Sequence, residues 1–345
     1  MVGPGEIARR ARSRMSGRLE SLPILALHVH SACNCRCVMC DIWKANADKR
    51  DISPDDLARH IDDIRALRVQ RVMLTGGEPL LHRNLWSLCA QLQALRIRIT
   101  LVTTGLLIDG HAPDIAASVD TVVISLDGDQ VVHDEIRRVK GAFERIARGV
   151  MALHAQHPAP RLIARSVIQK TNMSSLQETI AAAHRMGFDE ISFLAADVST
   201  QAFNRPEPWP QERIAEVAIE AGDLDGLDAA IARAASQSAD LLANGFVAGG
   251  IESLDRIRHY YRALAGSGSL PAVQCNAPWI SAVLEPGGVT RPCFFQEPYG
   301  SAAGGLERAL NSPAAVAFRQ QLDVATNPTC RNCVCSLNLP LTQSV

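Results

Sequence analysis

The 345-residue sequence lacks any apolar run close to the ~20 residues that a membrane-spanning helix needs. Its arginine-rich start is not followed by the apolar stretch and small-residue cleavage site of a secretory signal. These two absences predict a cytoplasmic protein with no membrane span. The sequence also has no internal repeat and no low-complexity tract, so a repeat fold is not expected.

An excess of charge of either sign is also lacking. The chain has 35 Lys and Arg against 36 Asp and Glu, which gives a net charge of −1. No summed field attracts nucleic acid or an anionic membrane, so we expect neither as a partner and predict local recognition of the substrate. Residues 1–22 are the exception, and there we expect a solvated, partly helical basic leader, the alternative being an arm that touches RNA or a membrane. Its arginines are Arg9, Arg10, Arg12, Arg14 and Arg18.

Cysteine, in contrast, is plentiful. Ten cysteines cluster at metal-ligand spacings in a chain with no export signal, which favours metal ligation over disulfides. The apolar fraction of 47% and the charged fraction of 21% are typical of a globular protein with a sizeable core. We therefore expect a folded metalloprotein.

Between residues 24 and 194, short runs rich in Val, Ile and Leu alternate with amphipathic helical stretches. This is the pattern of βα units around a parallel sheet. Six units fall short of the eight that close a barrel, so the sequence predicts an α/β fold with a partial (β/α)6 barrel and its active site at the carboxyl ends of the strands. The six expected strands are 24–29, 71–74, 97–103, 121–126, 162–168 and 190–194.

The composition then changes along the chain and suggests four regions. After the leader at 1–22, the barrel occupies 23–200, and a proline-rich connector opens an alanine-rich helical bridge at 201–268. A Gly-Ser segment at 266–269 marks a linker, and five of the ten cysteines follow it in a small domain at 269–345.

Three cysteines directly follow the first expected strand. Cys33, Cys37 and Cys40 are spaced so that a short turn can place three thiolates on one iron–sulfur cluster and leave its fourth iron open. A structural zinc site is the alternative, but zinc usually needs a second cysteine pair nearby, and none follows. Cys35 lies between the ligands and is expected to be a spare thiol.

The Cys-x3-Cys-x2-Cys loop resembles the signature of the radical S-adenosylmethionine (SAM) superfamily. Met39 stands where that family usually has an aromatic residue, and it keeps an apolar side chain there. The resemblance implies that Cys33, Cys37 and Cys40 bind a catalytic [4Fe–4S] cluster whose open iron is chelated by SAM.

Other motifs at strand ends resemble cofactor contacts of the same superfamily. The turn Gly76-Gly77-Glu78-Pro79 resembles its GGE motif, in which glycines allow the backbone to approach the cofactor closely. Ser125 and Asp127 belong to a Ser-Leu-Asp-Gly run, and Thr104 stands where relatives often have Asn. Arg165 can bind the cofactor carboxylate or a substrate anion, although an ordinary salt bridge is an equal alternative. The resemblance implies cofactor-binding roles for Gly76, Gly77, Glu78, Pro79, Thr104, Ser125, Asp127 and Arg165.

The cysteines of the tail resemble the SPASM and twitch extensions of radical SAM enzymes. Five cysteines are too few for the two clusters of a full SPASM domain, so the resemblance implies one auxiliary [4Fe–4S] cluster. Cys275, Cys293, Cys330 and Cys333 are its expected ligands, with Cys335 as the alternative to Cys333. A four-cysteine zinc site fits the same spacing. Gly287 and Gly288 are expected to form a hairpin turn ahead of Cys293.

These features predict a radical SAM oxidoreductase that cleaves SAM reductively and abstracts hydrogen from a substrate carbon. The auxiliary cluster would then take the substrate electron, which favours dehydrogenation of a small metabolite. The twitch-like layout resembles enzymes that oxidise a small alcohol, and the short leader leaves no room for a peptide-recognition domain. A peptide-modifying maturase acting on a short peptide is the alternative, and a non-catalytic iron–sulfur or zinc protein is another. An external one-electron reductant such as flavodoxin or ferredoxin is the expected partner.

Overall fold

The computed structural model describes residues 2–345. Its centre is a sheet of nine strands in the order β6-β5-β4-β3-β2-β1-β7-β8-β9. The first six strands are all parallel and follow one another in sequence, which is the partial barrel expected from six βα units. They are β1 (Ile24–His30), β2 (Arg71–Gly76), β3 (Arg98–Thr103), β4 (Thr121–Ser125), β5 (Arg161–Ile168) and β6 (Glu190–Ala195). All six predicted strands are therefore confirmed.

The tail continues this sheet rather than forming a separate one. β7 (Ser281–Leu284) pairs in parallel with β1, and β8 (Val289–Arg291) pairs antiparallel with β7. β9 (Gly300–Ser301) then pairs antiparallel with β8. The hairpin predicted at Gly287 and Gly288 is confirmed between β7 and β8, and both glycines have a φ of 80°. Backbone hydrogen bonds thus fix the position of the tail beside the first strand of the barrel.

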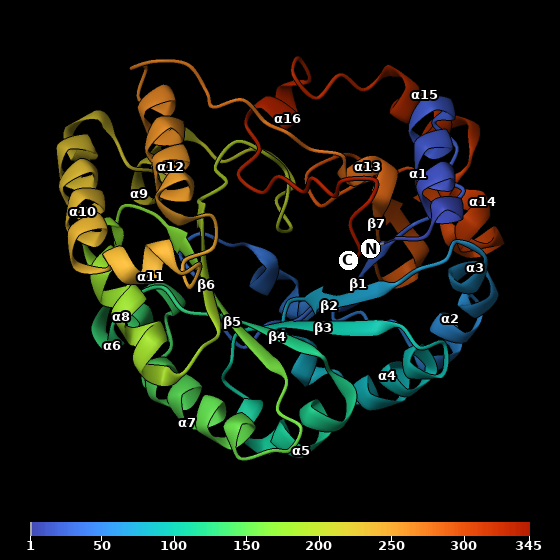
Figure 1. The fold of residues 1–345 in the computed structure, drawn as a ribbon, viewed down its shortest axis with the longest axis horizontal. Helices are drawn as coiled ribbons and strands as arrows, with labels where there is room; N and C mark the ends of the chain where they lie inside the picture. Colours follow the sequence, from blue (N-terminus) through green and yellow to red (C-terminus); the bar gives the residue numbers. More distant parts are fainter. Residues whose placement is uncertain (1) are drawn as a thin grey trace.

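Helices surround the strands on the outside (Figure 1). The barrel helices are α2 (Pro54–Ala58), α3 (Ile61–Ala66), α4 (Leu85–Ala94), α5 (Ile108–Ser118), α6 (Gln130–Arg137), α7 (Ala142–His154) and α8 (Leu176–Met186). The bridge contains α9 (Gln211–Val217), α10 (Leu224–Gln237), α11 (Ala239–Ala243) and α12 (Gly250–Leu264), and the tail contains α13 (Ala277–Ile280), α14 (Leu306–Leu310), α15 (Pro313–Gln321) and α16 (Pro328–Arg331). No helix among residues 2–345 has the length and apolar character needed to cross a bilayer.

Local sequence signals set several helix ends. Ser53 accepts a hydrogen bond from the Asp56 amide, and Asp56 accepts one from the Ser53 amide, which completes a capping box before Pro54. Gly187 closes α8 with a φ of 85°, a left-handed conformation that glycine adopts without steric cost.

The leader is partly helical, and Arg12, Arg14 and Arg18 are exposed as expected, but its helix also packs on the tail. α1 (Pro4–Ser16) lies beside α15 (Figure 1). Arg10 is only 2% exposed, because it pairs with Glu6 and donates a hydrogen bond to the Gln343 carbonyl at 2.7 Å. Asn311 also accepts from the Leu19 amide and donates to its carbonyl. The arginines that suggested a free arm include one that attaches the leader to the tail.

Tyr261 connects the helical bridge to the barrel. Its fully buried hydroxyl donates to the Ile168 carbonyl at 2.5 Å and accepts from the Ala196 amide at 3.0 Å, so it binds the ends of both β5 and β6. Burial raises the pKa of this phenol, which keeps it protonated and able to donate.

We predict that Tyr261→Phe lowers the free energy of unfolding by about 1–2 kcal/mol, because two buried hydrogen bonds are lost while the ring is retained. Urea unfolding of the anaerobic protein measures the change. Tyr260→Phe is the matched control, since the Tyr260 hydroxyl makes one long contact of 3.4 Å to the Ala196 carbonyl and its loss should cost less. Equal losses for the two variants would contradict the assignment.

Candidate active site

One cavity of about 370 Å³ brings both cysteine sets together. It lies inside the partial barrel, and its walls come from the strands, the first cysteine loop and the tail. The cysteines that line it are Cys33, Cys37, Cys40, Cys275, Cys293, Cys330, Cys333 and Cys335. Cysteines more than 200 residues apart in sequence therefore line the same cavity.

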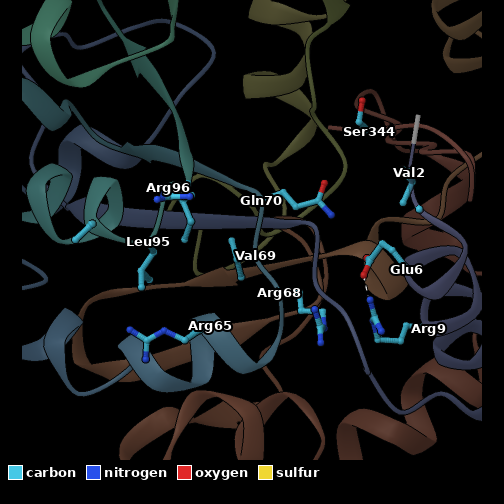
Figure 2. A pocket seen from close by; sticks show the side chains of 13 residues that line it. Val2, Glu6, Arg9, Arg65, Arg68, Val69, Gln70, Leu95, Arg96 and Ser344 are labelled. Carbon is cyan, nitrogen blue, oxygen red and sulfur yellow. Dashed lines mark hydrogen bonds and ion pairs between the residues drawn. The ribbon is translucent and has the colours of Figure 1, made fainter.

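A larger hollow of about 640 Å³ lies elsewhere and contains none of the predicted site residues. It is formed by the segments that precede β2 and β3 together with α1, which places it at the amino ends of the strands (Figure 2). Arg9, Arg65, Arg68 and Arg96 contribute to its wall. Because active sites of barrel folds lie at the opposite strand ends, the cysteine-lined cavity is the candidate active site.

The first cysteine loop is held in place by hydrogen bonds from other segments. Asn46 accepts from the Cys33 amide and donates to the Cys33 carbonyl, each at 2.9 Å. On the far side of the loop, the amides of Arg36 and Val38 donate to the last carbonyls of α6, those of Arg137 and Ile136. These bonds hold the loop open, so its thiols can face the cavity.

The structure separates Cys35 from the three predicted ligands. Cys33, Cys37 and Cys40 line the cavity, whereas Cys35 is 1% exposed and lies behind them. A hydrogen bond from the Cys35 thiol and the charge of Arg137 lower the pKa of Cys37 to about 6, against the effect of burial. Burial raises the pKa of Cys40 to about 12. The environment of Cys37 thus favours the thiolate, the form that binds iron.

A segment after β6 covers the outer side of the loop, which the sequence did not indicate. The indole of Trp209 donates to Asp41 at 2.8 Å, and the Arg205 guanidinium lies 3.9 Å from the centre of the Trp209 ring. Arg213 binds the Val38 carbonyl and also stacks on Trp209. In the sequence, this stretch looked only like a proline-rich connector.

The two glycines of the GGE turn line the cavity and pack against the backbone before Cys33. A Cβ on Gly77 would lie 2.1 Å from the Ala32 carbonyl oxygen, and one on Gly76 would lie 2.3 Å from that of His30. The amides of Gly77 and Glu78 donate to these same carbonyls at 2.8 Å. The turn therefore needs glycine to fit beside the first cysteine loop.

Glu78 and Pro79 do not line the cavity but are buried behind it. The Glu78 carboxylate accepts hydrogen bonds from the Leu80 and Thr104 amides and from the hydroxyls of Thr103 and Thr104. Burial raises its pKa, and these hydrogen bonds oppose that shift. In this structure Glu78 joins the ends of β2 and β3 and supports the cofactor-facing turn from behind.

Thr104, Ser125 and Arg165 lie in the cavity wall, as expected of cofactor contacts. Ser125 and Arg165 are register partners on β4 and β5, and Arg165 donates to the Ser192 hydroxyl at 3.2 Å. Asp127 lies outside the wall. Its fully buried carboxylate forms an ion pair with Arg137 and accepts from the Val167 amide at 2.8 Å.

The tail cysteines line the same cavity as the first cysteine loop. Burial raises the pKa values of Cys293, to about 11, and of Cys330 and Cys333, and the charge of Cys275 acts in the same direction on all three. The charges of both Cys275 and Cys293 reach Cys333, whereas Cys335 is affected by Cys275 and Arg165. Both Cys333 and Cys335 line the cavity.

The donor set suits iron–sulfur clusters. Thiolates are the ligands of such clusters, and the Gln296 amide donates to the Cys330 sulfur at 3.3 Å, a contact of the kind that tunes them. The three loop thiols face a wall of backbone at Gly76 and Gly77 that leaves space for a small ligand. Within residues 2–345, no three His, Cys, Asp or Glu side chains converge as they do around one metal ion.

Comparison with known proteins identifies the barrel. Residues 27–183 match the model of the radical SAM superfamily. Among curated relatives, the pre-heme d1 synthase of Dinoroseobacter shibae is 29% identical over 171 residues, which cover 49% of this chain and 42% of the relative. The mycofactocin maturase MftC of Mycolicibacterium smegmatis is 29% identical over 161 residues, 45% of this chain and 40% of the relative. These matches span less than half of the relatives.

Solved structures share the fold over a longer range. Streptococcus suis SuiB bound to S-adenosylmethionine has a TM-score of 0.62 at 16% identity and covers 95% of this chain and 75% of its own. Native anSMEcpe with bound AdoMet has a TM-score of 0.65 at 15% identity, covering 88% and 84%. The likeness to SuiB therefore extends from the barrel into the cysteine-bearing tail.

We predict that Gly77→Ala removes iron from the first site, because the added methyl group displaces the backbone before Cys33. Iron analysis of the anaerobically reconstituted protein should fall from about eight to about four irons per chain, with [4Fe–4S] as the unit. Gly110→Ala is the matched control, since a Cβ there meets nothing within 4 Å. A Gly77→Ala protein with full iron content would show that the close approach is not required.

For the second site, we predict that Cys333→Ala lowers the iron content to about four per chain while Cys335→Ala leaves about eight, because Cys333 is the fourth ligand expected from the sequence. Cys89→Ala is the control, as Cys89 is buried in α4 away from the cavity. The opposite result would make Cys335 the fourth ligand. Bound zinc with only about four irons in the unaltered protein would refute the tail assignment.

Proposed function

We propose that the chain is a radical SAM oxidoreductase that uses SAM to dehydrogenate a small metabolite, which the match of residues 27–183 to the superfamily model supports. The observation that carries this proposal is the single cavity that both cysteine sets line. A substrate bound there has the site of radical formation on one side and an electron acceptor on the other. That arrangement suits removal of a hydrogen atom followed by removal of an electron.

Different residues of the cavity would bind the first cluster and SAM. Cys33, Cys37 and Cys40 would each bind one iron of the first [4Fe–4S] cluster and leave the fourth for SAM. When bound, these groups would supply a SAM-derived radical able to take a hydrogen atom from a substrate carbon, and an electron acceptor held by the tail cysteines. Gly76 and Gly77 give SAM a wall without side chains, and Ser125 and Arg165 offer a hydroxyl and a guanidinium to its carboxylate.

The tail thiols would saturate the auxiliary cluster. With Cys275, Cys293, Cys330 and Cys333 on its four irons, no iron is left for the substrate, so its role is electron transfer. One electron enters from an external carrier such as flavodoxin or ferredoxin to start each turnover, and one leaves the substrate. The substrate thereby loses one hydrogen atom, one electron and one proton, which is a two-electron oxidation.

The cavity limits the size of the reacting group. A volume of about 370 Å³ is at the lower end of the ~300–1,000 Å³ of small-molecule sites, and the cofactor takes part of it. Most of its lining is apolar, for example Met73, Val102, Leu194 and Phe295, which keeps water from the radical. A small metabolite fits this space.

A peptide maturase is the second candidate. MftC is named a maturase, and SuiB has been solved bound to the precursor peptide SuiA. One side chain of a short peptide fits the same cavity as a small metabolite. The two proposals differ in whether the rest of a peptide lies outside the cavity. Identifying the substrate therefore distinguishes them.

We predict that the reconstituted and reduced protein converts SAM to 5′-deoxyadenosine and methionine, as measured by liquid chromatography. The triple variant Cys33→Ala, Cys37→Ala, Cys40→Ala should lose this activity entirely. No 5′-deoxyadenosine above that control would refute the enzyme and leave a non-catalytic metal-binding protein. Stimulation by a panel of cyclitols and amino alcohols supports the dehydrogenase, and stimulation only by short peptides supports the maturase.

A further inference from the structure

Arg137 lies against the first cysteine loop, although no sequence motif pointed to it. Its Nη1 donates to the Cys37 sulfur at 3.5 Å, and its side chain is part of the cavity wall. The last turn of α6 places it there, because the carbonyls of Ile136 and Arg137 bind the loop amides on either side of Cys37. These hydrogen bonds therefore fix the position of the Arg137 guanidinium relative to the first cysteine loop.

The charge of Arg137 is buried and balanced by one carboxylate. The side chain of Arg137 is 9% exposed and that of Asp127 is 0% exposed, and the two form an ion pair. Asp127 is held in turn by the Val167 amide, and its own amide donates to His133 Nδ1 at 3.1 Å. Charges in such a dry setting act strongly on their neighbours.

We propose that Arg137 is a positioning residue that raises the reduction potential of the cluster on Cys33, Cys37 and Cys40, and that Asp127 limits this effect. The inference rests on the proposed function only in requiring a cluster at these thiols. Reduction adds one negative charge to the cluster, and a guanidinium on a ligand sulfur stabilises the reduced form more than the oxidised form. Asp127 forms an ion pair with the Arg137 guanidinium, and its negative charge offsets part of the effect of the positive charge on the cluster.

The two residues should therefore shift the potential in opposite directions. Arg137→Gln removes the positive charge and should lower the potential, whereas Asp127→Asn removes the negative charge, keeps an oxygen for the Val167 amide and should raise it. A role in folding alone predicts damage of the same kind from both variants. The sign of the shift distinguishes the two explanations.

The test is a dithionite titration of the reconstituted protein with redox mediators, followed by electron paramagnetic resonance. At a fixed potential, we expect about a tenfold lower ratio of reduced to oxidised first cluster in Arg137→Gln, which is a shift of about 59 mV for one electron. Asp127→Asn should raise the ratio. Arg137→Lys should recover part of the loss, because the charge remains without the planar fork.

Arg36→Gln is the matched control. It removes the same charge from the first cysteine loop itself, but Arg36 is exposed and lies 5.9 Å from the Trp43 ring centre, so water screens it. The auxiliary cluster provides an internal reference whose potential should not move. If Arg137→Gln does not fold, a raised ratio in Asp127→Asn still supports the proposal.

Unchanged potentials in folded Arg137→Gln and Asp127→Asn, or shifts of the same sign in these two variants, would overturn it. Absence of any reducible cluster in the unaltered protein would overturn the proposed function as well. A cluster with an unshifted potential would overturn the role of Arg137 alone.

Discussion

The first cysteine loop has to remain open, and the surrounding structure depends on how that is achieved. The loop connects β1 to the short helical turns after Cys40 and has no sheet or long helix of its own to fix it. Its backbone groups are bound from several sides, by Asn46, by the last turn of α6 and by Arg213 in the segment around Trp209. An open loop with fixed thiols is possible because other elements supply the hydrogen bonds that it cannot make internally.

The parallel sheet explains why so much of the barrel could be predicted. Strands buried on both faces need continuous runs of Val, Ile and Leu, and these runs are visible without knowledge of the fold. Gly76 and Gly77 were also recognisable as a motif, and their close approach to His30 and Ala32 requires glycine. The three loop cysteines were recognisable from their spacing in the sequence. Each of these signals is local, which is why the sequence alone contains it.

What the sequence did not reveal depends on contacts between distant segments. Arg137 reaches Cys37 across 100 positions, and Arg213 reaches Val38 across 175, so no local pattern marks either residue. Asp127 stood in a recognisable motif, yet its carboxylate turns away from the cavity toward Arg137. The attachment of the basic leader was missed for a related reason: Arg12, Arg14 and Arg18 are exposed as their charge suggested, but Arg10 is buried, where it pairs with Glu6 one turn earlier and donates to a carbonyl in the tail.

The pairing of β7 with β1 links these observations to chemistry. Because β7 extends the sheet in parallel beside the strand that leads into the first cysteine loop, the tail cannot swing away as a separate domain would. The leader strengthens this arrangement, since its helix is bound to the tail while its chain continues directly into β1. The two thiol sets are therefore kept on one cavity by main-chain hydrogen bonds and by buried charges. A fixed distance between an electron donor and an acceptor is what a two-electron oxidation through two one-electron steps requires. Under the proposed function, the sheet edge that completes the fold would also set that distance.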